Sequence, residues 1–137
     1  MRQPTTQARP AGHPGYSETF SRAPESVGIA RRLVRTALAT WRLEQLADSA
    51  ELITSELVTN AVQHARSSAV RVVVSRPSVK SVHVAVVDKS RAEPVRCAAG
   101  EDDEGGRGLA LVELLADSWG TDPLPWGKRV WAELVAS

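Results

Sequence analysis

Hydrophobic residues recur with two different periods along this chain. A period near 3.6 residues, typical of an amphipathic helix, runs over residues 24–41 and again over residues 44–65. Residues 70–76 and 82–88 are instead short runs rich in β-branched side chains, which are typical of strands. The pattern therefore predicts two helices followed by a β-hairpin.

Three further elements complete the expected fold. We expect residues 16–21 to form a first edge strand, residues 109–119 a third helix, and residues 128–135 a closing strand. Helices gathered on one side of a mostly antiparallel sheet give a two-layer α+β sandwich, which is the fold class that we predict.

Alternation along the strands assigns side chains to the two faces of this sheet. If Val82, Val84 and Val86 face the helices, His83, Ala85 and Val87 face outward, and Trp131 lies on the face opposite Val130 and Ala132. An outer face with such apolar residues is either an ordinary surface or a surface for a partner, and the pattern alone leaves both interpretations open.

The second helix combines an apolar face with two polar side chains of chemical interest. Its apolar face consists of Leu46, Ala50, Ile53, Leu57 and Ala61. Glu56 and Asn60, four residues apart, lie roughly 100° round the helix from that face, at its border. A carboxylate there can be partly desolvated, and an amide oxygen can bind a hard cation such as Mg²⁺. A solvated pair beside a core helix is the alternative.

Two more segments carry candidate chemistry downstream. Asp88 ends a strand and shares the parity of Val86, so its carboxylate should point between sheet and helices. A glycine-rich turn, Gly105-Gly106-Arg107-Gly108, then leads into a helix whose first free N–H groups favour an anion such as phosphate. Taken singly, Asp88 also suits a turn, and the glycines also suit a tight connection to a helix.

Composition narrows the possible functions. The 137 residues allow one domain, and we assign it to residues 16–137, because residues 1–15 contain three prolines and few apolar residues and are expected to be a disordered arm. A formal charge of +1 argues against direct nucleic-acid binding. Cys97 is the only cysteine, and no run resembles a signal peptide or a membrane span. We therefore predict a cytoplasmic protein without membrane contact.

The order of these features resembles a known family. Glu-Leu-Val-Thr-Asn-Ala on a helix, Asp88 at a strand end, Gly-Arg-Gly-Leu-Ala-Leu-Val, and a final strand with Val-Trp-Ala-Glu-Leu resemble the boxes of the GHKL (Bergerat) ATP-binding superfamily, which includes histidine kinases and type II topoisomerases. Within it, the chain is most similar to the stand-alone anti-sigma factor serine kinases of Gram-positive bacteria. The resemblance covers nearly everything after Tyr16.

The resemblance implies ATP and Mg²⁺ as cofactors and assigns roles to residues. Asp88 would accept a hydrogen bond from the adenine amino group, Asn60 would hold Mg²⁺, and Glu56 would be the catalytic base that orients a serine hydroxyl. The expected nucleotide-binding set is Asn60, Asp88, Gly106, Arg107, Gly108 and Leu109. The implied partners are a sigma factor and an anti-anti-sigma (STAS-type) protein, and the implied assembly is a homodimer.

Two positions depart from the family pattern. Lys89 stands where the family commonly has a glycine after the Asp, and Arg129 stands where the final strand usually has a threonine. Both changes enlarge a side chain that we expect to lie beside the base. The same fold acting as an interaction module without turnover, with weak or lost nucleotide binding, therefore stays open as the alternative function. A detached histidine-kinase domain is less favoured, because no phospho-acceptor hairpin precedes residue 16.

Overall fold

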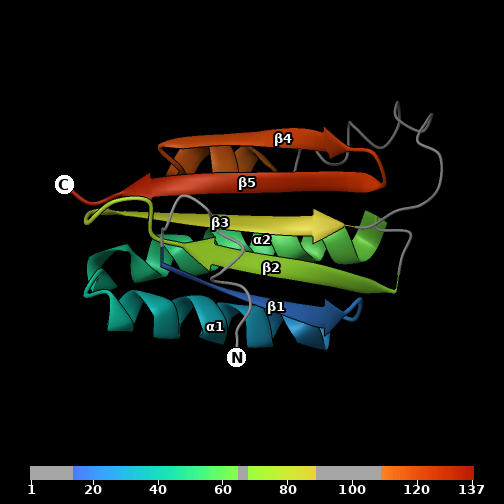
Figure 1. Cartoon of the computed structure of the whole chain (residues 1–137), viewed down its shortest axis with the longest axis horizontal. Coiled ribbons are helices and arrows are strands. Elements are labelled where there is room, and N and C mark those ends of the chain that lie inside the picture. Colours follow the sequence, from blue (N-terminus) through green and yellow to red (C-terminus); the bar gives the residue numbers. More distant parts are fainter. Residues whose placement is uncertain (1–13, 65–67, 89–108) are drawn as a thin grey trace.

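The computed structural model describes residues 14–64, 68–88 and 109–137. They form an α+β sandwich of two layers, in which a five-stranded sheet lies in front of the helices in the view of Figure 1. The predicted fold class is confirmed. The elements are β1 (Gly15–Ser21), α1 (Glu25–Thr40), a 3-10 turn (Glu44–Leu46), α2 (Ala47–His64), β2 (Ala69–Ser75), β3 (Ser81–Asp88), β4 (Ser118–Leu124) and β5 (Gly127–Val135). Residues 109–115 are also helical.

The sheet is open and its strand order is β1-β2-β3-β5-β4. Each neighbouring pair is antiparallel. In β3 and β5, Asp88 pairs with Lys128 at one end and Ser81 pairs with Val135 at the other. The last residues of β3 and the first residues of β5 therefore meet at the same end of the sheet.

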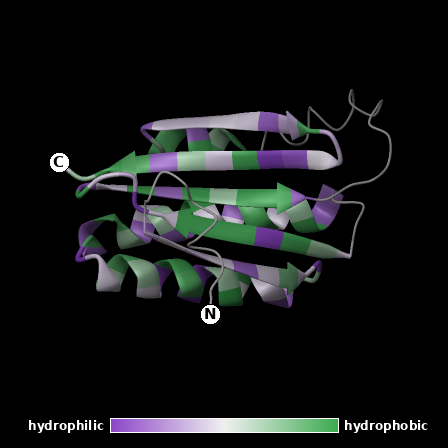
Figure 2. Ribbon diagram, viewed as in Figure 1, coloured by the Kyte–Doolittle hydropathy of each residue, from purple (hydrophilic) through white to green (hydrophobic). Residues whose placement is uncertain are grey.

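The core lies between the sheet and α1 and α2. Alternate residues of the strands enter it, and all of the following are buried: Val70, Val72, Val74, Val82, Val84, Val86, Val130, Ala132 and Leu134. The predicted apolar face of α2 packs against them, with Ala50, Ile53, Leu57 and Ala61 buried. Figure 2 shows this as hydrophobic colouring along β2 and β3, while β1 and β4 at the two edges are largely polar. The predicted assignment of Val82, Val84 and Val86 to the helix side is confirmed.

The region after the third helix differs from our expectation. The helix does not reach residue 119, because helical residues end at 115 and the N–H of Asp117 donates to the carbonyl oxygen of Glu133 on β5. Residues 118–124 form the edge strand β4, which the pattern did not predict. Gly120 and Pro123 obscured it, since both residue types are depleted in strands. Proline is tolerated on an edge, and a Cβ at Gly120 would lie 3.0 Å from the ring of Trp131.

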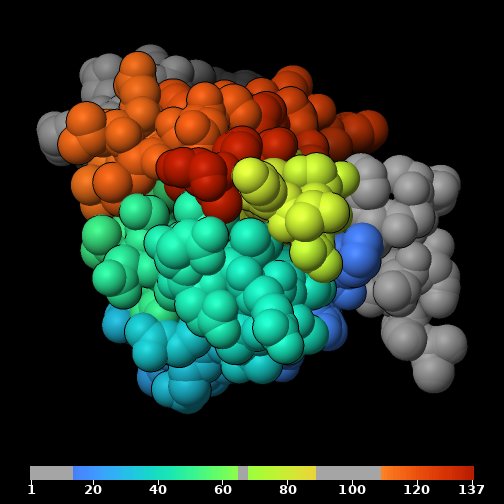
Figure 3. All heavy atoms as spheres, turned by 90° about the vertical axis from the view of Figure 1, so that its left-hand side faces the viewer, coloured from blue at the N-terminus to red at the C-terminus, as the bar shows by residue number. Residues whose placement is uncertain are grey.

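The end of the sheet opposite Asp88 is closed by the chain terminus. Figure 3 shows the C-terminal residues (red) beside the turn between β2 and β3 (yellow-green). The N–H of Ala136 donates to the carbonyl oxygen of Lys80 at 2.7 Å.

Among the residues described, no helix is long and apolar enough to cross a membrane. The disordered arm expected for residues 1–15 falls almost entirely outside the described residues, and it stays a prediction.

Candidate nucleotide site

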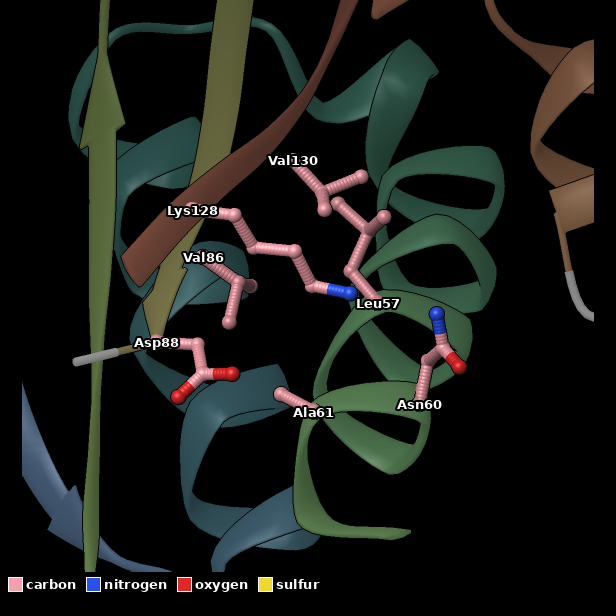
Figure 4. A pocket seen from close by; sticks show the side chains of 7 residues that line it. All are labelled: Leu57, Asn60, Ala61, Val86, Asp88, Lys128 and Val130. Carbon is pink, nitrogen blue, oxygen red and sulfur yellow. The ribbon is translucent and has the colours of Figure 1, made fainter. Parts of the chain in front are cut away.

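A hollow lies between the sheet and α2 at the end of the sheet where β3 finishes and β5 begins (Figure 4). Three elements line it. Its lining residues are Leu57, Asn60 and Ala61 from α2, Val86 and Asp88 from β3, and Lys128 and Val130 from β5. Asn60 and Asp88, which are separated by 28 positions in the sequence, are thus brought to one place.

Asp88 reaches the hollow because side chains alternate along β3 and its side chain points to the helix side of the sheet. It follows Val84 and Val86 on the helix side of the strand, and it is only 5% exposed. The prediction that its side chain points between sheet and helices is confirmed. An ionised carboxylate is an acceptor only, so it suits a ligand that presents an N–H donor, such as an exocyclic amine.

Asn60 is held at the opposite wall by the packing of α2. Its neighbours Leu57 and Ala61 are buried against the sheet, and they fix the angle at which the helix presents the Asn60 amide. Glu56 lies about one turn earlier on α2, some 6 Å along the helix axis. Glu56 is half-buried and stands outside the set of described residues that line the hollow. Its catalytic role stays a prediction.

Lys128 is a charged lining residue that we did not predict. It precedes Val130, Ala132 and Leu134 at alternate positions of β5, so it faces the helices as they do. Its aliphatic stem passes close to the apolar walls, and its ammonium points across the hollow toward α2 (Figure 4). The alternation of β5 was the signal that could have found it.

Arg129 was expected beside the adenine end of the site, and this expectation is wrong. Successive strand residues point to opposite faces, so Arg129 lies on the outer face of the sheet with Trp131. There its Nη1 pairs with Oδ2 of Asp122, the residue opposite it on β4, at 2.5 Å. Lys89, the other departure, lies outside the described residues.

The glycine-rich turn cannot be placed in the same way. Gly106, Arg107 and Gly108 lie outside the described residues, and their role in phosphate binding stays a prediction. Leu109 begins the helical residues 109–115 and packs, partly buried, against the core. It stands outside the lining set of the hollow, and its assignment to nucleotide binding is untested.

The chemistry of the residues that line the hollow suits part of a nucleotide. Leu57, Ala61, Val86 and Val130 give it apolar walls for a flat base, while a carboxylate, an amide and an ammonium supply polar contacts. No group of three or more His, Cys, Asp or Glu side chains gathers as a metal cluster within the described residues. Of the lining residues, Asn60 offers an amide oxygen of the kind that Mg²⁺ accepts beside phosphate oxygens and waters.

Comparison with protein families identifies the family to which this fold belongs. The profile of the histidine kinase-like ATPase domain matches residues 20–133, from the last two residues of β1 to within two residues of the end of β5. The chain belongs to the histidine kinase-like ATPase domain family. No curated protein matches it. The match spans the helix with Glu56 and Asn60, the strand end at Asp88 and the strand with Lys128, so the hollow is placed in the ATP-binding fold of that family.

Proposed function

We propose that this histidine kinase-like ATPase domain is a cytoplasmic bacterial anti-sigma regulatory factor that binds Mg-ATP, sequesters an alternative sigma factor and phosphorylates a serine of an anti-anti-sigma protein. The observation that carries the nucleotide part is that Asn60 and Asp88 line opposite walls of one hollow. The partners rest on the resemblance of Glu-Leu-Val-Thr-Asn-Ala and Val-Trp-Ala-Glu-Leu to the stand-alone anti-sigma kinases. A homodimer is part of the same proposal.

In this proposal Asp88 and Asn60 bind different parts of Mg-ATP. Asp88, buried at the β3 wall, accepts a hydrogen bond from the adenine amino group, and this contact discriminates ATP from GTP, which has no amine at that place. Asn60 offers its amide oxygen from α2 to the metal ion. Mg²⁺, when bound, neutralises developing charge on the phosphates during transfer.

Glu56 acts on the second substrate. Because it stands one turn from Asn60 and outside the lining of the hollow, it can face an incoming serine without displacing the nucleotide. The serine Oγ forms a bond to the γ-phosphorus, the bond from that phosphorus to the oxygen of ADP breaks, and the hydroxyl proton passes to the Glu56 carboxylate. Glu56 is only half-buried, so part of the residue is open to solvent, from which a partner protein would approach.

One observation favours a second candidate, an interaction module without turnover. The side chain of Lys128 extends from β5 across the hollow toward α2, into the space that a base would occupy. In this alternative the same fold holds a sigma factor or its antagonist, and the nucleotide site is closed.

Titration calorimetry with Mg-ATP and Mg-GTP, followed by incubation with labelled ATP and candidate anti-anti-sigma proteins, tests the proposal. We expect ATP to bind, GTP to bind at least about tenfold more weakly because one hydrogen bond to a buried carboxylate is lost, and label to appear on a partner serine. The absence of ATP binding, together with nanomolar capture of a sigma factor, would overturn the kinase and establish the interaction module.

A further inference from the structure

Lys128 lies in the row of β5 residues whose side chains face the core. The row that faces the helices from β5 consists of Lys128, Val130, Ala132 and Leu134, and the last three are buried. Desolvating an ammonium group is costly unless it keeps a polar contact, whereas its methylene stem can pack on apolar surface. The stem lies between Val86 and Val130, and the ammonium points across the hollow toward Leu57 and Asn60 of α2 (Figure 4).

The charges around this cation divide the hollow into two ends. Asp88 is the direct cross-strand neighbour of Lys128, and its carboxylate lies on the β3 side of the hollow. The ammonium reaches past it toward Leu57 and Asn60 of α2. One end of the site is therefore an acceptor for a donor group, and the other combines the Lys128 cation with the Asn60 amide.

A nucleotide has the matching polarity. Its base carries an amine, which can donate a hydrogen bond to a carboxylate. A lysine ammonium has three donors and no acceptor, so it cannot accept that hydrogen bond. Its phosphates are strong acceptors with negative charge, which an ammonium binds through charge-assisted hydrogen bonds. Arg129 cannot supply this contact, because it is paired with Asp122 on the opposite face of the sheet.

We propose that Lys128 is a phosphate-binding residue of this site, which contacts the phosphate chain of ATP while Asp88 reads the base. The inference rests on the proposed function in that ATP must occupy the hollow. It adds a specificity device: the site prefers nucleotides over nucleosides through a residue of the last strand, next to the metal-binding amide of Asn60.

Calorimetry on three variants separates this role from packing. Lys128→Met keeps most of the stem and removes the charge, Lys128→Arg keeps the charge, and Lys80→Met makes the same change at an exposed lysine at the other end of the sheet. Each protein is titrated with Mg-ATP, adenosine and inorganic tripolyphosphate with Mg²⁺, at two salt concentrations. Circular dichroism confirms that each variant is folded.

We expect Lys128→Met to bind Mg-ATP and tripolyphosphate roughly 10- to 100-fold more weakly, the scale of a lost hydrogen bond between charged groups, and with a flatter dependence on salt. Adenosine affinity should change less than about twofold, Lys128→Arg should retain most of the ATP affinity, and Lys80→Met should match the wild type.

Different results overturn different claims. Equal losses for ATP and adenosine would show that Lys128 only packs, and tighter ATP binding by Lys128→Met would show that it blocks the hollow. Either result removes the phosphate role while leaving ATP as the ligand. A wild-type protein that binds neither ATP nor adenosine would instead overturn the proposed function, and the role of Lys128 with it.

Discussion

The two faces of the sheet are built from the same strands, yet they carry different chemistry. On the helix-covered face, the side chains of β2, β3 and β5 are buried and apolar until the end of the sheet, where Asp88 and Lys128 line the hollow. On the outer face, the ring of His83 stacks on Trp131 with centroids 5.2 Å apart, and Arg129 pairs with Asp122. The outward orientation predicted for His83 and Trp131 agrees with this stack.

Lys128 and Arg129 show most directly what the comparison teaches. They are adjacent basic residues, and their Cα atoms are separated by a single peptide unit. Because strand side chains alternate, one enters the hollow and the other joins a surface ion pair. Proximity in sequence to a binding residue is therefore a weaker guide to function in this sheet than the face on which a side chain lies.

The largest effect that would sharpen the comparison concerns the helix side. Glu56→Gln should lower the rate of phosphotransfer to a partner serine roughly 10²- to 10⁴-fold, the usual range for a lost general base, and leave ATP affinity unchanged. Single-turnover kinetics with labelled ATP measures the rate. Glu44→Gln, at an exposed glutamate just before α2, is the matched control. Equal rates for the wild type and Glu56→Gln would remove Glu56 from the chemistry.

A smaller effect tests the α2 wall of the hollow. Asn60→Ala removes an oxygen ligand without opening a large cavity, and we expect it to weaken Mg-ATP binding by about 10- to 100-fold or more. Calorimetry with Mg²⁺ and with a chelator separates the metal role, since the difference from the wild type should shrink without metal. Gln63→Ala, on the exposed side of the same helix, should bind like the wild type. An Asn60→Ala protein with unchanged Mg-ATP affinity would contradict the assignment.

Much of this architecture follows from residue patterns. Helical periodicity predicted α1 and α2, and the β-branched runs predicted β2 and β3, because burial of one face requires those periods. The parity of Asp88 with Val86 was enough to direct its carboxylate into the layer that α2 covers. The approach of Asp88 to Asn60 needed the antiparallel pairing and helix packing that only the folded chain provides.

Two features escaped the patterns for different physical reasons. The strand β4 contains Gly120, which leaves room for the ring of Trp131, and Pro123, which an edge accepts, so tertiary contacts override the local propensity. Lys128 was readable from the alternation of β5, but a family pattern drew attention to Arg129 instead. A sequence motif locates the segment that contains a binding residue. The alternation of side chains along the strand determines which residue of that segment faces the ligand.

A pair of equal truncations on β3 measures how differently the two faces contribute to stability. Val84→Ala, at a side chain 1% exposed, should lower the free energy of unfolding by about 2 kcal/mol, since two carbon groups leave a cavity in the core. Val87→Ala, half-buried on the outer face, should cost less than about 1 kcal/mol. Urea denaturation measures both. A larger loss at Val87 would indicate that the outer face is the better packed of the two.

The smallest expected effect concerns Arg129. Its side chain and that of Asp122 are 36% and 47% exposed, so their ion pair is screened by solvent, and Arg129→Thr should change the free energy of unfolding by less than about 1 kcal/mol. Because Arg129 lies on the face opposite the hollow, ATP affinity should also change by less than about twofold, in contrast to Lys128→Met. The pair of variants is compared by calorimetry and urea denaturation in the same buffer. If Arg129→Thr shifted ATP affinity tenfold while Lys128→Met did not, the assignment of the two faces to ligand and surface would have to be reversed.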